Sequence, residues 1–209
     1  MNKAWLVRPI PHKHNRINEF KSMNIIAVGW PFIGNLSGKS RTDIKSLLQE
    51  EPYDLTGLKL GNVYPNLDIL VNRMNVNDLV LIPNGDDIYF GKINSDYIYD
   101  ESKDNDEEGY PHQRKIIFLH GPISRSILPN SLRSSLKSQR TISELSKHYD
   151  IIKQLSEGKS VNDLEDSNGF IDIEYPIRPN LSVKISLPED ISQSEANRLG
   201  DFIKTIYFE

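Results

Sequence analysis

Aromatic and basic side chains interleave through the first 120 residues, and this combination suits the binding of nucleotides. An aromatic ring can stack on any nucleobase, while arginine and lysine hold the phosphates of the chain. The aromatic candidates for a base pocket lie at expected strands or strand ends: Trp5, Trp30, Tyr64, Phe90 and Tyr97. The basic candidates for phosphate contacts lie near them in sequence: Arg8, Lys39, Arg41, Arg73 and Arg114.

Trp30 is the best candidate for the rim of such a pocket. It follows Gly29, which would let a ligand approach the backbone, and it precedes Pro31, which fixes the path of the chain. The alternative is that these aromatic residues fill a hydrophobic core, because every domain of this size needs large apolar side chains.

The motifs that could carry catalysis are all incomplete. Gly34 and Gly38, followed by Lys39, resemble a phosphate-binding loop, but three residues separate the glycines where that loop needs four. The acidic run that begins at Asp104 resembles a calcium loop, but its twelfth position holds Lys115 in place of glutamate. The histidines have no third ligand near them in sequence, and the serines between 124 and 138 lack a glycine-flanked nucleophile elbow. We therefore expect no catalytic residue, no metal and no cofactor, and we interpret the protein as a non-enzyme.

The composition restricts the class of protein further. The 209 residues include 37% hydrophobic residues and no cysteine, which is enough apolar material for one ordinary domain and excludes disulfides and thiolate chemistry. No stretch approaches the ~18 consecutive apolar residues of a membrane span. The first residues lack the apolar core of a secretory signal, so we expect a cytoplasmic protein with no membrane partner.

The net charge of −4 is distributed in blocks. Residues 1–50 carry eight Lys and Arg against three acids, and residues 112–153 carry eight against two. Residues 86–109, in contrast, hold nine acids against two basic residues. The two basic segments could fold onto one face and present a positive surface, although such blocks are also typical of ordinary solvated surface.

Hydrophobic periodicity and turn residues predict an α+β fold for residues 1–125. Strands are expected at 3–8, 24–30, 79–82, 88–93 and 112–119, and helices at 12–23, 42–50 and 67–74. The last of these strands alternates as a half-buried edge strand does, and the acidic tract at 100–109 is expected to be an exposed insert. Short strands with few helices favour a small mixed or antiparallel β-barrel with flanking helices.

The pattern changes after residue 125. Residues 126–156 are expected to form a helical extension with helices at 131–138 and 141–155, the second opening with the capping-box pattern of Thr141 and Glu144. Residues 157–209 are expected to form a small ββα tail, with strands at 170–175 and 181–187 and a helix at 192–207. This tail has too small a core of its own, so we expect it to dock on a second copy, giving a homodimer, or on an effector subunit.

Several short strings occur in an order that resembles a known family over residues 3–125. The chain resembles the amino-terminal specificity domains of modification-dependent restriction systems of the McrB and Mrr type, which are similar to EVE and YTH domains in the PUA-like superfamily. The strings that carry the resemblance are Ala4 to Arg8, Ile26 to Trp30, Asn77 to Ile82, Tyr89 to Ile93, Asp96 to Tyr99 and His112 to Ile116.

The resemblance implies a PUA-like β-barrel whose aromatic pocket receives a base flipped out of the duplex. It also implies a role in restriction or phage defence, with a separate nuclease or AAA subunit as effector, because neither follows residue 125 in this chain. Recognition of a modified base in DNA is thus the favoured interpretation. Two alternatives stay open: an RNA-binding PUA-like module, and an enzyme of an unrecognised type.

Overall fold

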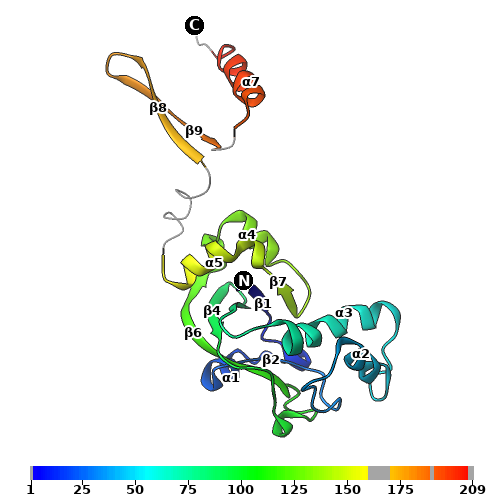
Figure 1. The fold of residues 1–209 in the computed structure, drawn as a ribbon. Coiled ribbons are helices and arrows are strands. Elements are labelled where there is room, and N and C mark those ends of the chain that lie inside the picture. The colour runs from blue at the N-terminus through cyan, green and yellow to red at the C-terminus, as the bar shows by residue number, and fades with distance from the viewer. Residues whose placement is uncertain (1, 160–169, 189–190, 207–209) are drawn as a thin grey trace. The chain divides into compact units, whose positions relative to one another are not determined.

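The computed structural model describes residues 2–159, 170–188 and 191–206 and divides into two units. Unit 1 covers residues 1–161 and unit 2 covers residues 162–209 (Figure 1). The expected boundary near residue 125 therefore falls inside unit 1. None of the helices in the described ranges is both long enough and apolar enough to cross a membrane.

Unit 1 is a mixed α+β structure built on one seven-stranded sheet. Its strands are β1 (Ala4–Val7), β2 (Ile25–Val28), β3 (Leu79–Asn84), β4 (Asp87–Ile93), β5 (Ile98–Tyr99), β6 (His112–Ser124) and β7 (Ile142–Glu144). Its helices are α1 (Ile17–Met23), α2 (Arg41–Gln49), α3 (Gly57–Asp68), α4 (Asn130–Ser135) and α5 (Tyr149–Ser156). Short 3-10 turns lie at η1 (Pro11–Lys13), η3 (Glu101–Lys103), η4 (Arg125–Ile127) and η5 (Ser146–His148), and one π turn, η2 (Ile69–Arg73), continues α3.

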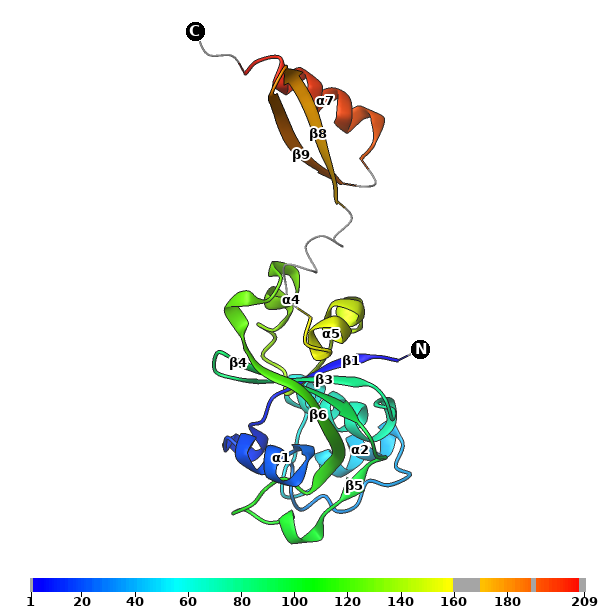
Figure 2. The ribbon, with the colours of Figure 1, turned by 90° about the vertical axis from the view of Figure 1, so that its left-hand side faces the viewer.

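The strand order is β2-β6-β4-β3-β1-β7, and β5 pairs with the start of β6 on the edge opposite β2. Strands β1 and β3 are parallel, and the other pairs are antiparallel. The long strand β6 changes partners along its length: residues 112–115 pair with β2, and residues 116–124 pair with β4. This change of partner curls the sheet into half a barrel (Figure 2). Strand β6 is thus internal, which corrects the expected edge strand at 112–119.

Strands β1 and β3 are buried on both faces, because successive side chains point to opposite sides of a sheet. Trp5 and Val80 belong to the main core, which also includes residues of α1, α2 and η2. Leu6 and Leu81 are fully buried on the opposite face. Figure 2 shows α1 and α2 on one side of these strands and α4 and α5 on the other, so the segment after residue 125 covers the second face of the sheet.

Three expected helices differ from the structure. The helix expected at 12–23 begins only at Ile17, and residues 11–13 form the separate 3-10 turn η1. Residues 141–144 do not begin a helix; they form β7, which pairs with β1 and completes the sheet edge. Helix α3 begins at Gly57, ten residues before the expected start at residue 67, and contains Pro65 in its interior. The capping-box pattern of Thr141 and Glu144 was misleading because residues 142–144 pair with the free edge of β1 as a strand.

Unit 2 contains strand β8 (Phe170–Arg178), strand β9 (Leu181–Pro188) and helix α7 (Gln193–Ile203). The strands form an antiparallel hairpin. Helix α7 begins with a capping box in which Ser192 and Glu195 satisfy each other's backbone N–H groups. The strands and the helix expected from the sequence over 170–206 are confirmed, within a few residues at their ends.

Candidate functional site

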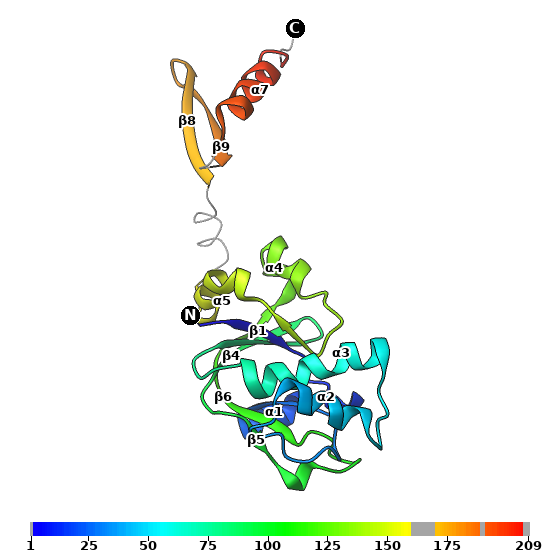
Figure 3. The same cartoon turned by 45° about the vertical axis from the view of Figure 1, so that its right-hand side comes forward.

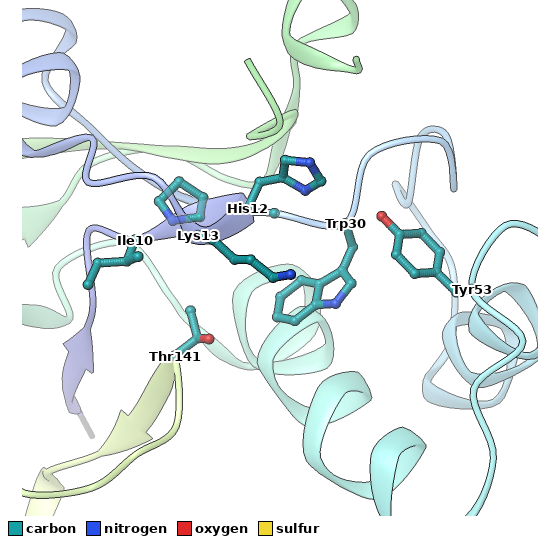
Figure 4. Close-up of a pocket in the computed structure, with 8 residues that line it drawn as sticks. Ile10, His12, Lys13, Trp30, Tyr53 and Thr141 are labelled. Carbon is teal, nitrogen blue, oxygen red and sulfur yellow. The ribbon is translucent and has the colours of Figure 1, made fainter. Parts of the chain in front are cut away.

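A cavity of about 390 Å³ lies where the loops after β1 and β2 meet (Figure 4). Eight residues line it: Ile10, Pro11, His12, Lys13, Gly29, Trp30, Tyr53 and Thr141. They come from four separate parts of the chain, which strand pairing between β1 and β7 and the loop between α2 and α3 bring together. The volume lies at the lower end of the ~300–1,000 Å³ that small-molecule pockets occupy.

The backbone of the cavity wall is strained. His12, Lys13 and Trp30 have φ angles of 47°, 67° and 68°, in the left-handed region that residues with a Cβ rarely adopt. Each such residue costs on the order of 1–3 kcal/mol and persists only where the surrounding structure enforces it. Three of the eight described non-glycine residues with positive φ line this cavity, which supports it as a candidate functional site.

Two glycines make room for His12. A Cβ on Gly29 would lie 2.8 Å from the backbone nitrogen of His12, and a Cβ on Gly109 would lie 2.6 Å from the His12 side chain. Gly109 also has a φ of +67°. Gly29 is therefore needed for the approach of the His12 backbone, which corrects the expectation that it makes room for a ligand. The segment 10–13 is thus wedged against the end of β2.

A relay of hydrogen bonds holds the backbone of Trp30. The Nε2 atom of His112 lies 3.2 Å from the Trp30 carbonyl oxygen, and Nδ1 lies 2.7 Å from the Tyr97 hydroxyl. A carbonyl oxygen only accepts, so Nε2 carries the proton and Nδ1 accepts from Tyr97. The Tyr97 oxygen in turn accepts from the amide of Leu36 over 3.2 Å. Burial lowers the pKa of His112 to about 4, so the ring is neutral at pH 7 and the relay keeps this direction.

The acidic tract fixes the chain on the far side of Trp30. Asp104 accepts hydrogen bonds from the amide of Phe32 and from the Tyr99 hydroxyl. The Tyr53 hydroxyl donates to the Pro31 carbonyl over 2.9 Å, and burial, with Asp104 nearby, raises the pKa of Tyr53 to about 12. The tract at 100–109, expected as an exposed insert, therefore supports the loop that carries Trp30.

Of the five aromatic residues predicted for a base pocket, Trp30 lines this cavity. Trp5 and Phe90 are fully buried, and the indole N–H of Trp5 donates to Asp78 over 2.8 Å. These two predictions are corrected, because both rings are fully buried in the interior and a base cannot stack on them in this structure. Tyr97 is half-buried and stacks on His112 at a centroid distance of 6.0 Å, which places it behind the cavity.

Tyr64 lies on the outer part of α3, away from the cavity lining. The guanidinium of Arg41 and the ammonium of Lys45 lie 4.9 Å and 4.5 Å from the centre of its ring, and Arg41 donates to its hydroxyl. Figure 3 shows α2 and α3, which carry these residues, side by side. Tyr64 therefore lies beside two cations, the exposed Arg41 and the half-buried Lys45, and is not a wall of this cavity.

Two of the five predicted phosphate-binding residues are buried or half-buried and donate hydrogen bonds to backbone carbonyls. Arg114 is only 3% exposed and donates to the carbonyl oxygens of Leu70, Val71 and Ser95. These bonds tie η2 to the sheet and occupy the donors of Arg114, so its main role in this structure is to hold the backbone. Arg114 also lines a second cavity of about 270 Å³, together with Tyr97 and Gly38. Arg8 is half-buried, and its guanidinium donates to two backbone carbonyls near the end of α4.

The other three basic candidates are on the surface. Lys39 and Arg41 are exposed at the start of α2. Arg73 is exposed and pairs with Glu144, 3.1 Å away.

Sequence reasoning missed the cavity residues His12, Lys13, Tyr53 and Thr141, because each lies in a loop or at a strand end and only the tertiary fold brings them together.

Comparison with known proteins assigns the family. The pattern that defines DUF8426, a domain of unknown function, matches residues 5–146. This chain belongs to the DUF8426 family. The matched residues of the DUF8426 domain contain the whole sheet apart from the first residue of β1, and all eight residues that line the cavity. Unit 2 lies outside the match.

The other comparisons add little. No curated protein matches the chain. Among solved structures, the crystal structure of the protein Atu2648 from Agrobacterium tumefaciens is similar at 10% sequence identity. That similarity covers 76% of this chain and 99% of that one, with a TM-score of 0.33, which is too low to support conclusions about either fold or function.

Proposed function

We propose that the DUF8426 domain of this chain is a non-catalytic nucleic-acid reader that holds one flipped, modified base of DNA in the Trp30 cavity. One observation carries the proposal: Trp30 is a half-buried aromatic residue, held on strained backbone, at the wall of a cavity. Within the described ranges, no residue accepts a hydrogen bond from its indole N–H. A ligand in the cavity could therefore stack on the ring or accept from its edge.

The chemistry of the lining suits a nucleobase. Unstacking a base from a duplex costs a few kcal/mol, and aromatic stacking returns ~1–3 kcal/mol per base. Trp30 and Tyr53 supply aromatic surface, Ile10 supplies apolar surface that an added methyl group can contact, and Thr141 supplies a hydroxyl. A pocket with apolar walls and a few placed polar groups is typical of small-ligand recognition.

In this proposal, exposed lysine and arginine side chains bind phosphates and supply the part of the affinity that does not depend on base sequence. Figure 4 shows the Lys13 side chain extending beside Trp30, so its ammonium is placed to meet a phosphate next to the bound base. Lys39, Arg41 and Arg73 are the surface candidates for phosphates farther along the strand. Phosphate contacts fix the position of a protein on DNA, and the pocket then selects the base.

The resemblance to EVE and YTH domains suggests the wider setting. In this proposal the curled sheet is a PUA-like barrel, and the protein acts in the cytoplasm in restriction or phage defence. Recognition of a modified base in foreign DNA then recruits a separate nuclease or AAA subunit that acts on it. The reader itself needs no catalytic residue and no cofactor.

A binding series with the full chain tests the proposal. The probes are matched oligonucleotides of DNA and RNA, each unmodified, methylated or hydroxymethylated, measured over a range of salt concentrations. The expected result is tighter binding to one modified DNA than to its unmodified match at every salt concentration. Equal affinity for all DNA probes, or preference for an RNA probe, would overturn the proposed substrate.

Substitution of Trp30 tests the pocket. Trp30→Ala should lower the affinity for the preferred DNA about tenfold or more and leave non-specific binding little changed, because it removes the stacking surface. Tyr89→Ala is the matched control, since Tyr89 is also a half-buried aromatic residue of unit 1 but lies outside the cavity. If instead Trp30→Ala loses about 3–5 kcal/mol of stability and affinity falls only with the folded fraction, Trp30 is a packing residue.

A further inference from the structure

The hairpin of unit 2 has one continuous apolar face. Side chains directly opposite each other in an antiparallel pair share a face, so each cross-strand pair can be assigned to one side. Three alternate pairs are apolar on both strands: Ile171 with Leu187, Ile173 with Ile185, and Tyr175 with Val183. The pairs that alternate with them are Phe170 with Pro188, Asp172 with Ser186, Glu174 with Lys184 and Pro176 with Ser182. One face therefore carries a continuous row of large apolar side chains, and the other is mixed and carries the charged residues.

This apolar face is largely exposed within unit 2. Among the described side chains of this unit, none is buried. Tyr175 is 62% exposed on the hairpin, and Phe202 is 61% exposed on α7. A lone two-stranded hairpin is at best marginally stable in water, because it buries too little apolar surface to offset the ordering of its chain. The unit therefore needs a partner for its apolar face.

We propose that unit 2 is a dimerisation element, in which the apolar face of the hairpin, together with the exposed apolar side chains on and just after α7, packs against the same surface of a second copy. The face contains no charged residue among its three apolar pairs, so a two-fold arrangement brings no like charges together. The charged pair Glu174 and Lys184 stays on the outer face, where Ser182 donates a hydrogen bond to Glu174. Two sheets that meet in this way pack about 10 Å apart and bury both inner faces.

The available surface is large enough for a dimer. The set of exposed large apolar residues in this unit comprises Ile171, Ile173, Tyr175, Ile177, Leu181, Val183, Phe202, Ile203 and Ile206. Their exposed fractions run from 39% to 62%. Full burial of one such side chain removes on the order of 100 Å² of apolar area from water, so covering their exposed halves removes roughly 500 Å² per copy. The two copies together then bury about 1,000 Å², the size at which a specific interface becomes stable.

The occupant is a second copy because the face offers nothing that would select a different protein. Specificity for another partner normally rests on charges or polar groups placed to match it. The three apolar pairs supply only shape and hydrophobic surface, and an identical face complements them. Dimers formed in this way carry two DUF8426 domains on one molecule, which raises the affinity for DNA with two target sites without any new contact.

Mass measurement on the full chain tests the proposal. Light scattering and sedimentation from about 1 µM to about 100 µM should give twice the chain mass of 24.0 kDa at the upper concentrations. Ile173→Glu, which places a charge in the middle of the apolar face, should raise the dissociation constant about a hundredfold or more. The control Ser182→Lys also introduces a charge, but on the outer face beside Glu174, and should leave the dissociation constant unchanged. Both tryptophans lie in unit 1, so their fluorescence checks that unit 1 stays folded in each variant.

Cross-linking guards against the case in which Ile173→Glu unfolds the hairpin. The chain has no cysteine, so a single introduced thiol reports one position. Ile173→Cys should form covalent dimers under mild oxidation much faster than Ser182→Cys. A mass of 24.0 kDa at every concentration, a doubled mass that survives Ile173→Glu, or equal cross-linking of the two cysteine variants would each overturn the proposal.

Discussion

The buried histidine behind the cavity gives the sharpest test of the structure. Burial lowers the pKa of His112 to about 4, although its contact with the Trp30 carbonyl and the charge of Asp104 oppose this. An unfolded chain takes up a proton near the ordinary pKa of about 6.5, whereas the folded chain excludes it. The unfolded state therefore binds more protons between these two values, and stability must fall as the pH falls through this window.

The size of the effect follows from the two pKa values. One pKa unit corresponds to about 1.36 kcal/mol, so the full difference between 6.5 and 4 is worth about 3 kcal/mol. Only part of it develops at moderate pH: the loss of stability between pH 7 and pH 5 due to His112 is about 2 kcal/mol. Above pH 7 the ring is neutral in both states, and the contribution to the pH dependence disappears.

Urea unfolding of the full chain, followed by tryptophan fluorescence from pH 7 to pH 5, measures this loss. His112→Gln keeps an amide N–H that can donate to the Trp30 carbonyl but does not titrate, so its stability should fall about 2 kcal/mol less than that of the unaltered chain over this range. His14→Gln replaces an exposed histidine and should give a curve parallel to the unaltered chain. If His112→Gln also runs parallel, His112 is hydrated or charged in the folded protein, and the relay to Trp30 is refuted.

Other substitutions test how the cavity and the charges are built. Gly109→Ala should cost more than about 2 kcal/mol of stability, because its Cβ would lie 2.6 Å from His12 at a φ of +67°; Gly34→Ala, at a φ of +69° in open space, should cost about 1 kcal/mol. Equal losses in denaturant unfolding would show that His12 yields freely. Arg114→Met should cost about 3 kcal/mol and leave the salt dependence of DNA binding unchanged, whereas Arg41→Ala should preserve stability and lower the salt slope by about one. The reverse pattern would place the phosphate contact at Arg114.

The strands of the sheet could be predicted because their signals are local. Runs of β-branched and aromatic residues mark β1, β2, β3 and β4, and Gly85 supplies the positive φ that the hairpin turn between β3 and β4 requires. Helix α2 was equally clear, because Ile44, Leu47 and Leu48 form an apolar stripe that ends before Pro52. The structure adds a capping box of Ser40 and Asp43 at its start. These elements depend on residues within a few positions of one another.

The elements that failed depend on distant partners. Thr141 and Glu144 fit the capping-box pattern, but the open edge of β1 pairs with this segment and makes it a strand. The start of α3 at Gly57 gave little signal, because Gly61 and Pro65 both have low helix propensity. Tyr53 reaches the cavity only because the loop after α2 folds back to the Pro31 carbonyl. No spacing in the sequence encodes the pairing of β7 with β1 or the hydrogen bond from Tyr53 to Pro31.

The two tryptophans show why residue type alone could not locate the site. Trp5 lies on β1 and Trp30 lies just after the end of β2. Both were predicted to line the same pocket. A buried indole N–H needs an acceptor, and Trp5 finds one in the buried carboxylate of Asp78, which also accepts from the amides of Lys3 and Asn75. Trp5 is therefore bound into the core by a partner 73 residues away. Trp30 is held instead through its backbone carbonyl and packs only partly against the core, and no described residue accepts a hydrogen bond from its N–H at the cavity.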